Sequence, residues 1–179
     1  MPTGQPEVTT AEILFSEPFF LFWSGLVFVL GCLIGSFLNV AIYRMPLGMS
    51  VNKPRRSFCF RCGTHIRWYD NIPILSYLAL GGKDRACGAP YSPRYMIVEL
   101  LTGLLFLWVW LAHNQATPDG FSPLSIWYCL FVALLIIGSF TDIDHWIIPK
   151  QIPRIGVAGA LIAAAVAGWI ERDAMIAVA

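Results

Sequence analysis

Long apolar segments alternate with short polar ones along most of the chain. Four of them are long enough to cross a bilayer, at residues 19–43, 96–112, 124–141 and 155–170. A hydrocarbon core of about 30 Å needs about 20 apolar residues in a helix, so each segment predicts a transmembrane helix. The charged residues 171–173 are followed by a fifth apolar run at 175–179, which predicts the start of another helix.

The composition supports a membrane protein. Of 179 residues, 57% are hydrophobic and 13% are charged, and the mean hydropathy is +0.65. Soluble domains carry roughly 25% charged residues. This excludes a soluble or disordered chain, a small secreted disulfide scaffold and a nucleic-acid-binding domain. The predicted fold class is all-α: a polytopic helical membrane protein with about four transmembrane helices and the start of a fifth.

The charges divide the chain into three regions with net charges of −3, +7 and −3. The central region, 44–94, holds nine of the twelve basic residues and two acids, whereas 1–43 holds three acids and no base. Loops rich in Lys and Arg stay on the cytoplasmic side of membranes. This predicts a cytoplasmic loop and an outer N-terminus.

Three sequence regions follow from this topology. Residues 1–43 form the outer N-terminus and the first transmembrane helix, and residues 44–95 form a basic, cysteine-containing cytoplasmic loop. Residues 96–179 contain the remaining transmembrane helices. The basic residues of the loop have two interpretations. They set the topology and attract anionic lipid, at about 1 kcal/mol per charge, or they form a binding face for an acidic ligand; the first is favoured.

The loop contains two related cysteine motifs. Cys59 and Cys62 form a CxxC followed by glycine, and Asp84 and Cys87 repeat this pattern 25 residues later, with the aspartate in the first cysteine position. Paired motifs of this spacing are typical of zinc sites, in which a carboxylate can replace a thiolate. We therefore predict a four-ligand zinc site, with His65 as the alternative fourth ligand. The competing interpretation is three buried or free thiols.

Two polar features fall within the predicted helices. Glu99 lies near the cytoplasmic start of the second helix, where an ionisable residue is a functional candidate. The alternatives are that it reaches the interface or that it pairs with Arg94. Gly31 and Gly35 form a GxxxG motif in the first helix, a pattern that allows two helices to approach closely.

A second acidic cluster stands where the third helix meets the cytoplasm. Asp142 and Asp144 are two residues apart, so their side chains do not face each other on a helix and do not form a catalytic pair. Partial desolvation at a membrane boundary raises the pKa of a carboxyl group toward values that suit acid–base catalysis. The alternative is a helix-end pair solvated by headgroups and by His145.

Taken together, these residues resemble the type IV prepilin peptidase family. The motifs that carry the resemblance occur in order at residues 35–46, 59–62, 68–77, 87–95 and 98–100, followed by Asp142 seven residues before Pro149. They extend over about residues 19–160. The resemblance implies a polytopic aspartic protease of the bacterial inner membrane.

The resemblance also implies a substrate and two activities. Family members cleave the basic leader of type IV prepilins and pseudopilins at the cytoplasmic membrane face. They then methylate the new N-terminus with S-adenosylmethionine. Asp142, and not Asp144, occupies the position of the first catalytic aspartate, and the loop at 44–94 is associated with the methylating half. The expected partners are these pilin substrates and the bilayer, without nucleic acid.

The chain departs from the family pattern in two places. Asp84 stands where the family has a cysteine, so the metal set is complete only with a carboxylate. The second catalytic aspartate belongs to a Gly-x-Gly-Asp motif that the 179 residues do not contain. We therefore expect the front part of a longer enzyme, without peptidase activity by itself. The rival interpretations are a methyltransferase-only or non-catalytic scaffold and an unrelated zinc-bearing membrane protein.

Overall fold

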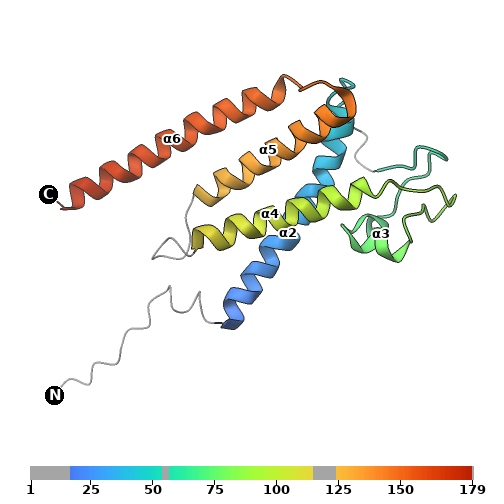
Figure 1. The fold of residues 1–179 in the computed structure, drawn as a ribbon, viewed down its shortest axis with the longest axis horizontal. Helices are drawn as coiled ribbons and strands as arrows, with labels where there is room; N and C mark the ends of the chain where they lie inside the picture. The colour runs from blue at the N-terminus through green and yellow to red at the C-terminus, as the bar shows by residue number, and fades with distance from the viewer. Residues whose placement is uncertain (1–16, 54–56, 115–123, 179) are drawn as a thin grey trace, which may run out of the picture.

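The computed structural model describes residues 17–53, 57–114 and 124–178, and these form a bundle of four long helices (Figure 1). The helices are α2 (Glu17–Arg44), α4 (Arg94–Asn114), α5 (Leu124–His145) and α6 (Gln151–Val178). All four contain a stretch long and apolar enough to cross a membrane, which confirms the predicted spans. The expected outer segment before residue 17 lies outside the described residues.

Helix α6 is longer than the sequence pattern indicated. It continues through residues 171–173, so the run at 175–178 belongs to the same helix instead of beginning a new one. No glycine or proline occurs between residues 169 and 178, and Glu171 and Arg172 are good helix formers, so nothing interrupts the helix there. Helix α6 lies along α5 and leaves most of its apolar surface exposed (Figure 1).

The closest contact in the bundle joins α2 to α4. A Cβ atom added at Gly31 would lie 2.8 Å from the Cα of Gly103, and one added at Gly35 would lie 2.8 Å from the Cα of Glu99. These distances are too short for any side chain, so the two backbones touch where the glycines are. The close approach expected of the GxxxG motif is confirmed. Near the other end of the pair, Trp110 donates a hydrogen bond to Ser24 Oγ at 3.2 Å.

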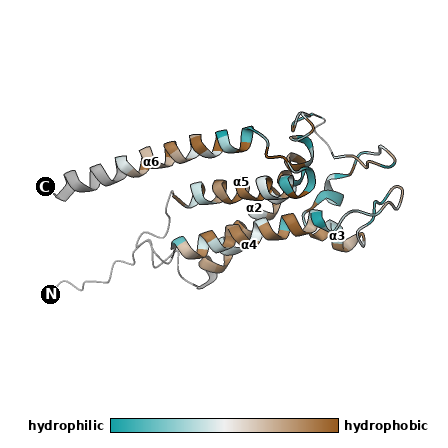
Figure 2. Ribbon diagram, turned by 45° about the horizontal axis from the view of Figure 1, so that its top comes forward, coloured by the Kyte–Doolittle hydropathy of each residue, from teal (hydrophilic) through white to brown (hydrophobic). Residues whose placement is uncertain are grey.

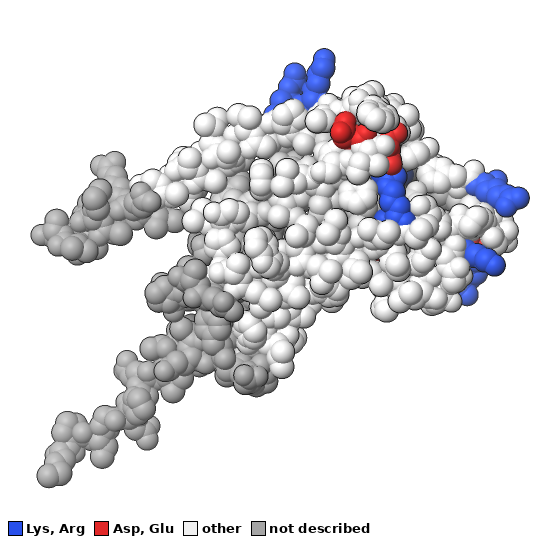
Figure 3. All heavy atoms as spheres, in the orientation of Figure 1, with Lys and Arg blue, Asp and Glu red and all other residues white. Residues whose placement is uncertain are grey.

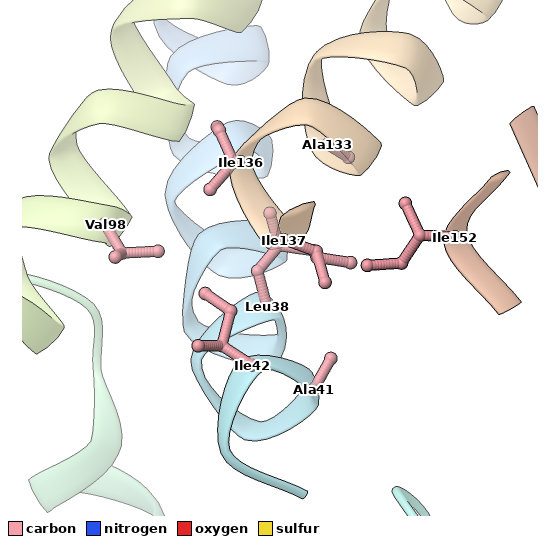
Figure 4. Close-up of a cluster of buried hydrophobic side chains, with 8 residues drawn as sticks. All are labelled: Leu38, Ala41, Ile42, Val98, Ala133, Ile136, Ile137 and Ile152. Atoms are coloured by element: carbon pink, nitrogen blue, oxygen red, sulfur yellow. The ribbon is translucent and has the colours of Figure 1, made fainter. Parts of the chain in front are cut away.

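A second contact draws all four helices together near the end of the bundle that carries the loop. Figure 4 shows side chains of α2, α4, α5 and α6 meeting there. The cluster consists of Leu38, Ala41, Ile42, Val98, Ala133, Ile136, Ile137 and Ile152, each at most 9% exposed. Outside this cluster, the helices present mostly apolar residues on their outer faces (Figure 2), as expected for surfaces that contact lipid.

Charged side chains gather at the same end. On the face shown in Figure 3, the blue and red atoms lie over the loop and the helix ends beside it, and the described middle of the bundle is free of them. The loop and these helix ends therefore mark one polar boundary of the membrane-spanning region.

We predict that the α2–α4 contact tolerates no larger residue. Gly31→Val should destabilise the protein by about 1–3 kcal/mol, because the added atoms meet the backbone of α4. The matched control is Gly25→Val in the same helix, where an added Cβ has no neighbour within 4 Å. Thermal unfolding in detergent measures both variants. Equal losses of stability would contradict the packing described for this contact.

Candidate functional site

The loop between α2 and α4 is organised around two short turns that have the same hydrogen bonds. In the first, the Cys59 amide donates to Thr64 O at 2.9 Å, and the Gly63 amide donates to Cys59 O at 2.8 Å. In the second, the Asp84 amide donates to Ala89 O at 2.8 Å, and the Gly88 amide donates to Asp84 O at 2.9 Å. The repeat seen in the sequence is therefore also a structural repeat.

A glycine follows the second ligand position in both turns for a conformational reason. Gly63 has a φ of 71° and Gly88 a φ of 67°, a region that only glycine adopts at little cost. This backbone reversal directs the following chain back alongside the preceding one. Phe58 then pairs with His65 and Lys83 with Pro90 as isolated antiparallel bridges.

The two turns bring together the four residues expected as metal ligands. One ligand atom from each of Cys59, Cys62, Asp84 and Cys87 lies within 4.8 Å of all the others. Cys59 Sγ and Cys87 Sγ are 3.6 Å apart, close to the separation of about 3.8 Å between two thiolates bound tetrahedrally at 2.3 Å. Three sulfurs and one carboxylate in this arrangement can bind a metal ion. His65 is not a member of this group.

Asp84 is held in place by three hydrogen bonds. Its Oδ1 accepts the amides of Ala86 at 2.8 Å and Cys87 at 2.9 Å, and its Oδ2 accepts the Tyr91 hydroxyl at 2.8 Å. The Cys87 amide and then the Tyr91 hydroxyl lower the pKa of this carboxyl group. Burial, followed by the nearby carboxylate, raises the pKa of Tyr91. Asp84 therefore remains an anion at neutral pH and Tyr91 remains a hydrogen-bond donor.

The exposed thiols of the cluster differ in acidity. The hydrogen bond with the Thr64 side chain is the main reason why the pKa of Cys62 falls to about 7. For Cys87, the Ala89 amide lowers the pKa, but desolvation and the neighbouring Cys62, Cys59 and Asp84 outweigh it and raise the pKa to about 12. A bound cation reverses the effect of crowded anions, because it favours the thiolates directly.

Two polar contacts near the loop ends were not identified from the sequence, one between α2 and α4 and one between α2 and the loop. Asn39 of α2 donates from Nδ2 to Tyr95 O of α4 at 3.0 Å. Arg44 at the end of α2 is buried and donates to Val51 O at 2.9 Å, which fixes the turn after the helix. Asn39 could have been noticed as a lone amide in an apolar span, whereas no local signal indicates the role of Arg44.

Glu99 does not form the expected alternative pair with Arg94. Its Oε2 instead accepts the backbone amide of Ile74 at 2.8 Å, and the side chain is buried. Arg94 forms an ion pair with Asp144, and its guanidinium group lies over the ring of Phe140. The start of α4 is thus fastened to the end of α5 by opposite charges at the polar boundary.

This ion pair distinguishes the surroundings of the two aspartates at the end of α5. Asp144 is engaged by Arg94, whereas the exposed carboxylate of Asp142 has no hydrogen bond or ion pair with the residues that the structure describes. The buried Thr141 next to it has an unpaired hydroxyl. The structure therefore places Asp142 at the polar boundary, as expected, and leaves its carboxylate available for other groups.

The basic residues of the loop do not form a single free surface. Arg85 donates to both oxygens of Asp70, with a shortest distance of 2.8 Å, and this partner raises the pKa of the guanidinium. A small pocket of about 150 Å³ beside this pair is lined by His65, Arg67, Asp84 and their neighbours. It is smaller than the 300–1,000 Å³ of most small-molecule sites, so it gives little support to an acidic ligand.

Comparisons with known proteins identify the family. Residues 29–113 match the family described as "Bacterial Peptidase A24 N-terminal domain". The chain is 44% identical over 154 residues to the Prepilin leader peptidase/N-methyltransferase of Myxococcus xanthus, covering 86% of this chain and 44% of that protein. The chain belongs to the prepilin peptidase family.

Two further relatives of this family agree. The protein of the same name from Klebsiella pneumoniae is 43% identical over 99 residues, which cover 52% of this chain and 43% of that protein. The "Type 4 prepilin-like proteins leader peptide-processing enzyme" of Escherichia coli is 35% identical over 161 residues, covering 80% and 56%. The chain spans about half the length of these relatives. No solved structure matches it.

We predict that the four-residue cluster binds one divalent metal ion per chain and that Asp84, not His65, is the fourth ligand. Asp84→Ala should weaken metal affinity by at least about tenfold, because it removes one of four ligands. His65→Ala should leave the affinity unchanged. Metal content and competition with a chelator measure both variants on purified protein. Retention of metal by the Asp84 variant together with its loss from the His65 variant would reverse the assignment.

Proposed function

We propose that the protein carrying this chain is a prepilin leader peptidase and N-methyltransferase. The observation that carries the proposal is the match to proteins of that name over 86% of the chain, which includes both the loop and the end of α5. The substrate would be a type IV prepilin or pseudopilin with a basic leader. In this proposal, cleavage occurs at the polar boundary where Asp142 lies and is followed by methylation of the new N-terminus.

Asp142 is the residue that we propose as one of the two catalytic carboxylates. An aspartic protease shares one proton between two carboxyl groups, so that one activates water and the other protonates the oxyanion or the leaving amine. The carboxylate of Asp142 is exposed at the end of a membrane helix, where a substrate helix crossing the same membrane would emerge. Asp144 is less suited to this role, because its charge is already paired with Arg94.

The metal cluster is proposed to hold zinc and to support the methylating activity. Three thiolates and a carboxylate suit the borderline-soft character of zinc, and four protein ligands are typical of structural zinc sites. When bound, the ion would cross-link the two turns of a loop that has little hydrophobic core. S-adenosylmethionine is proposed as the methyl donor from the name of the relatives.

The orientation is proposed from the charge distribution. The loop between α2 and α4 carries a net charge of +7 over residues 44–94 and would face the cytoplasm, which places residues 1–16 on the outer side. The protein would then be a multi-pass protein of the bacterial inner membrane, with Asp142 and the metal cluster on the cytoplasmic side.

We predict that Asp142→Asn abolishes leader cleavage, because a neutral amide cannot act as a general base. The assay follows the shift of a prepilin substrate on a gel, with the enzyme expressed from its complete gene in membranes. Asp144→Asn is the matched control and should retain cleavage, since its carboxylate serves an ion pair.

A second readout separates catalysis from folding in this experiment. Methyl transfer to a pilin that is already cleaved should continue in the Asp142 variant, because this step requires no peptide hydrolysis. Continued cleavage by the Asp142 variant would contradict the catalytic assignment. If the wild-type protein does not transfer a methyl group, this would contradict the proposed methyltransferase activity but not the peptidase activity.

A further inference from the structure

The loop contains a short helix whose apolar side is exposed among the residues that the structure describes. Helix α3 (Leu75–Ala79) follows the 3-10 turn η1 (Trp68–Asn71). Leu75 and Leu78 are each 63% exposed, and Trp68 is 80% exposed. Residues three apart lie on the same side of a helix, so the two leucines form one apolar face. The arrangement of this face relative to the membrane determines what can cover it.

A partly buried hydrogen bond holds the start of α3 against α4. Ile74, the residue before the helix, donates its amide to Glu99 Oε2 at 2.8 Å. Glu99 is the sixth residue of a membrane-spanning helix that begins at Arg94, which places its Cα about 7.5 Å along the axis. Because α3 starts at the next residue, its first residue lies near the first two turns of α4. Figures 1 and 2 both show α3 next to this end of α4.

The backbone makes a sharp turn at Ile74, where the Leu75 amide donates to Pro73 O at 2.5 Å. Ile74 has a φ of 62°, a region that β-branched residues rarely adopt and that persists only when the surroundings determine it. The hydrogen bond from the Ile74 amide to Glu99 joins this turn to α4, and the Cα of Glu99 lies against Gly35 of α2. The chain therefore turns sharply at Ile74 and enters α3 at the level of the membrane boundary.

The opposite face of α3 is turned toward the loop. The ring of Tyr77 lies against Gly82, where an added Cβ would meet it at 3.0 Å. Ser76 Oγ donates to Ile72 O at 2.6 Å, which satisfies the polar side chain within the segment. With Tyr77 directed inward, Leu75 and Leu78 point away from the loop. The exposed basic residues Arg67 and Lys83 flank this region.

We propose that α3 is an interfacial helix that inserts Leu75 and Leu78 into the lipid leaflet on the side of the loop. Trp68 then lies among the headgroups, where indole rings accumulate in membrane proteins. The net charge of +7 in residues 44–94 complements anionic lipid headgroups. The apolar face of α3 thus continues the lipid-facing surface of α4, which is exposed in the same way along its length.

A photo-reactive benzoylphenylalanine placed at position 78 tests this contact. The purified chain is reconstituted in nanodiscs of phosphatidylethanolamine and phosphatidylglycerol, irradiated and analysed by mass spectrometry. The matched control carries the same group at position 86, an exposed residue at the second cysteine turn. We expect lipid adducts at position 78 to exceed those at position 86 by at least about fivefold. Position 75 provides a second probe if the first variant does not fold.

The same experiment identifies other occupants of this face. Equal lipid labelling at positions 78 and 86 would overturn the proposal. So would an adduct at position 78 that joins two copies of the chain, since that outcome would indicate a dimer interface. The labelling at position 78 is also repeated with a prepilin substrate present. Replacement of the lipid adduct by an adduct to that substrate would overturn the proposal in favour of a substrate-binding face.

The hydrogen bond between the Ile74 amide and Glu99 is tested with two substitutions of Glu99, each combined with the probe at position 78. Glu99→Ala removes the acceptor of the Ile74 amide and should lower the yield of lipid adduct at least about threefold. Glu99→Gln keeps an acceptor oxygen and should retain the yield. Unchanged labelling in the alanine variant would show that Glu99 does not set the depth of α3. Metal content of both variants confirms that the remainder of the loop is folded.

Discussion

The direct backbone contact between α2 and α4 is the feature on which most of the described structure depends. Within lipid, apolar helices gain little from burying apolar surface, so close packing and hydrogen bonds hold them together. Gly31, Gly35 and Gly103 remove the side chains that would separate these two helices. As a result, Asn39 of α2 reaches the backbone of Tyr95 in α4, and Glu99 of α4 accepts the backbone amide of Ile74 in the loop. The position of the loop therefore depends on glycine at these three positions, because glycine has no side chain to separate the helices.

At the same boundary, electrostatic pairing distinguishes residues that look equivalent in the sequence. Asp142 and Asp144 differ in their surroundings because Arg94 forms an ion pair only with Asp144. Among the loop cations, Arg85 is likewise committed to Asp70, and Arg44 is buried against backbone carbonyls. The strong positive charge of this segment therefore supports the predicted topology more than it supports a binding site for an acidic ligand. The carboxylate of Asp142 has no such partner among the residues that the structure describes.

The sequence predicted the features that depend on local pattern or on repetition. The four spans follow from length and hydrophobicity, and Asp84 was identified because it repeats the position of Cys59. Features that rest on distant partners could not be predicted. The turn at Ile74 requires an acceptor 25 residues away, and the partner of Arg94 lies on another helix. The length of α6 was underestimated because a few charged residues are a poor signal for the end of a helix.

The aspartate in the second cysteine turn also has a redox consequence. A cluster of four thiols can be oxidised to two disulfides and then contains no free sulfur. Here Cys59, Cys62 and Cys87 supply only three, all of them unpaired in the structure. One internal disulfide would leave a single thiol within a few ångströms of the new bond. That thiol could attack the disulfide and exchange with it. Oxidation of this loop therefore leads to interconverting disulfide isomers, and never to a fully closed state.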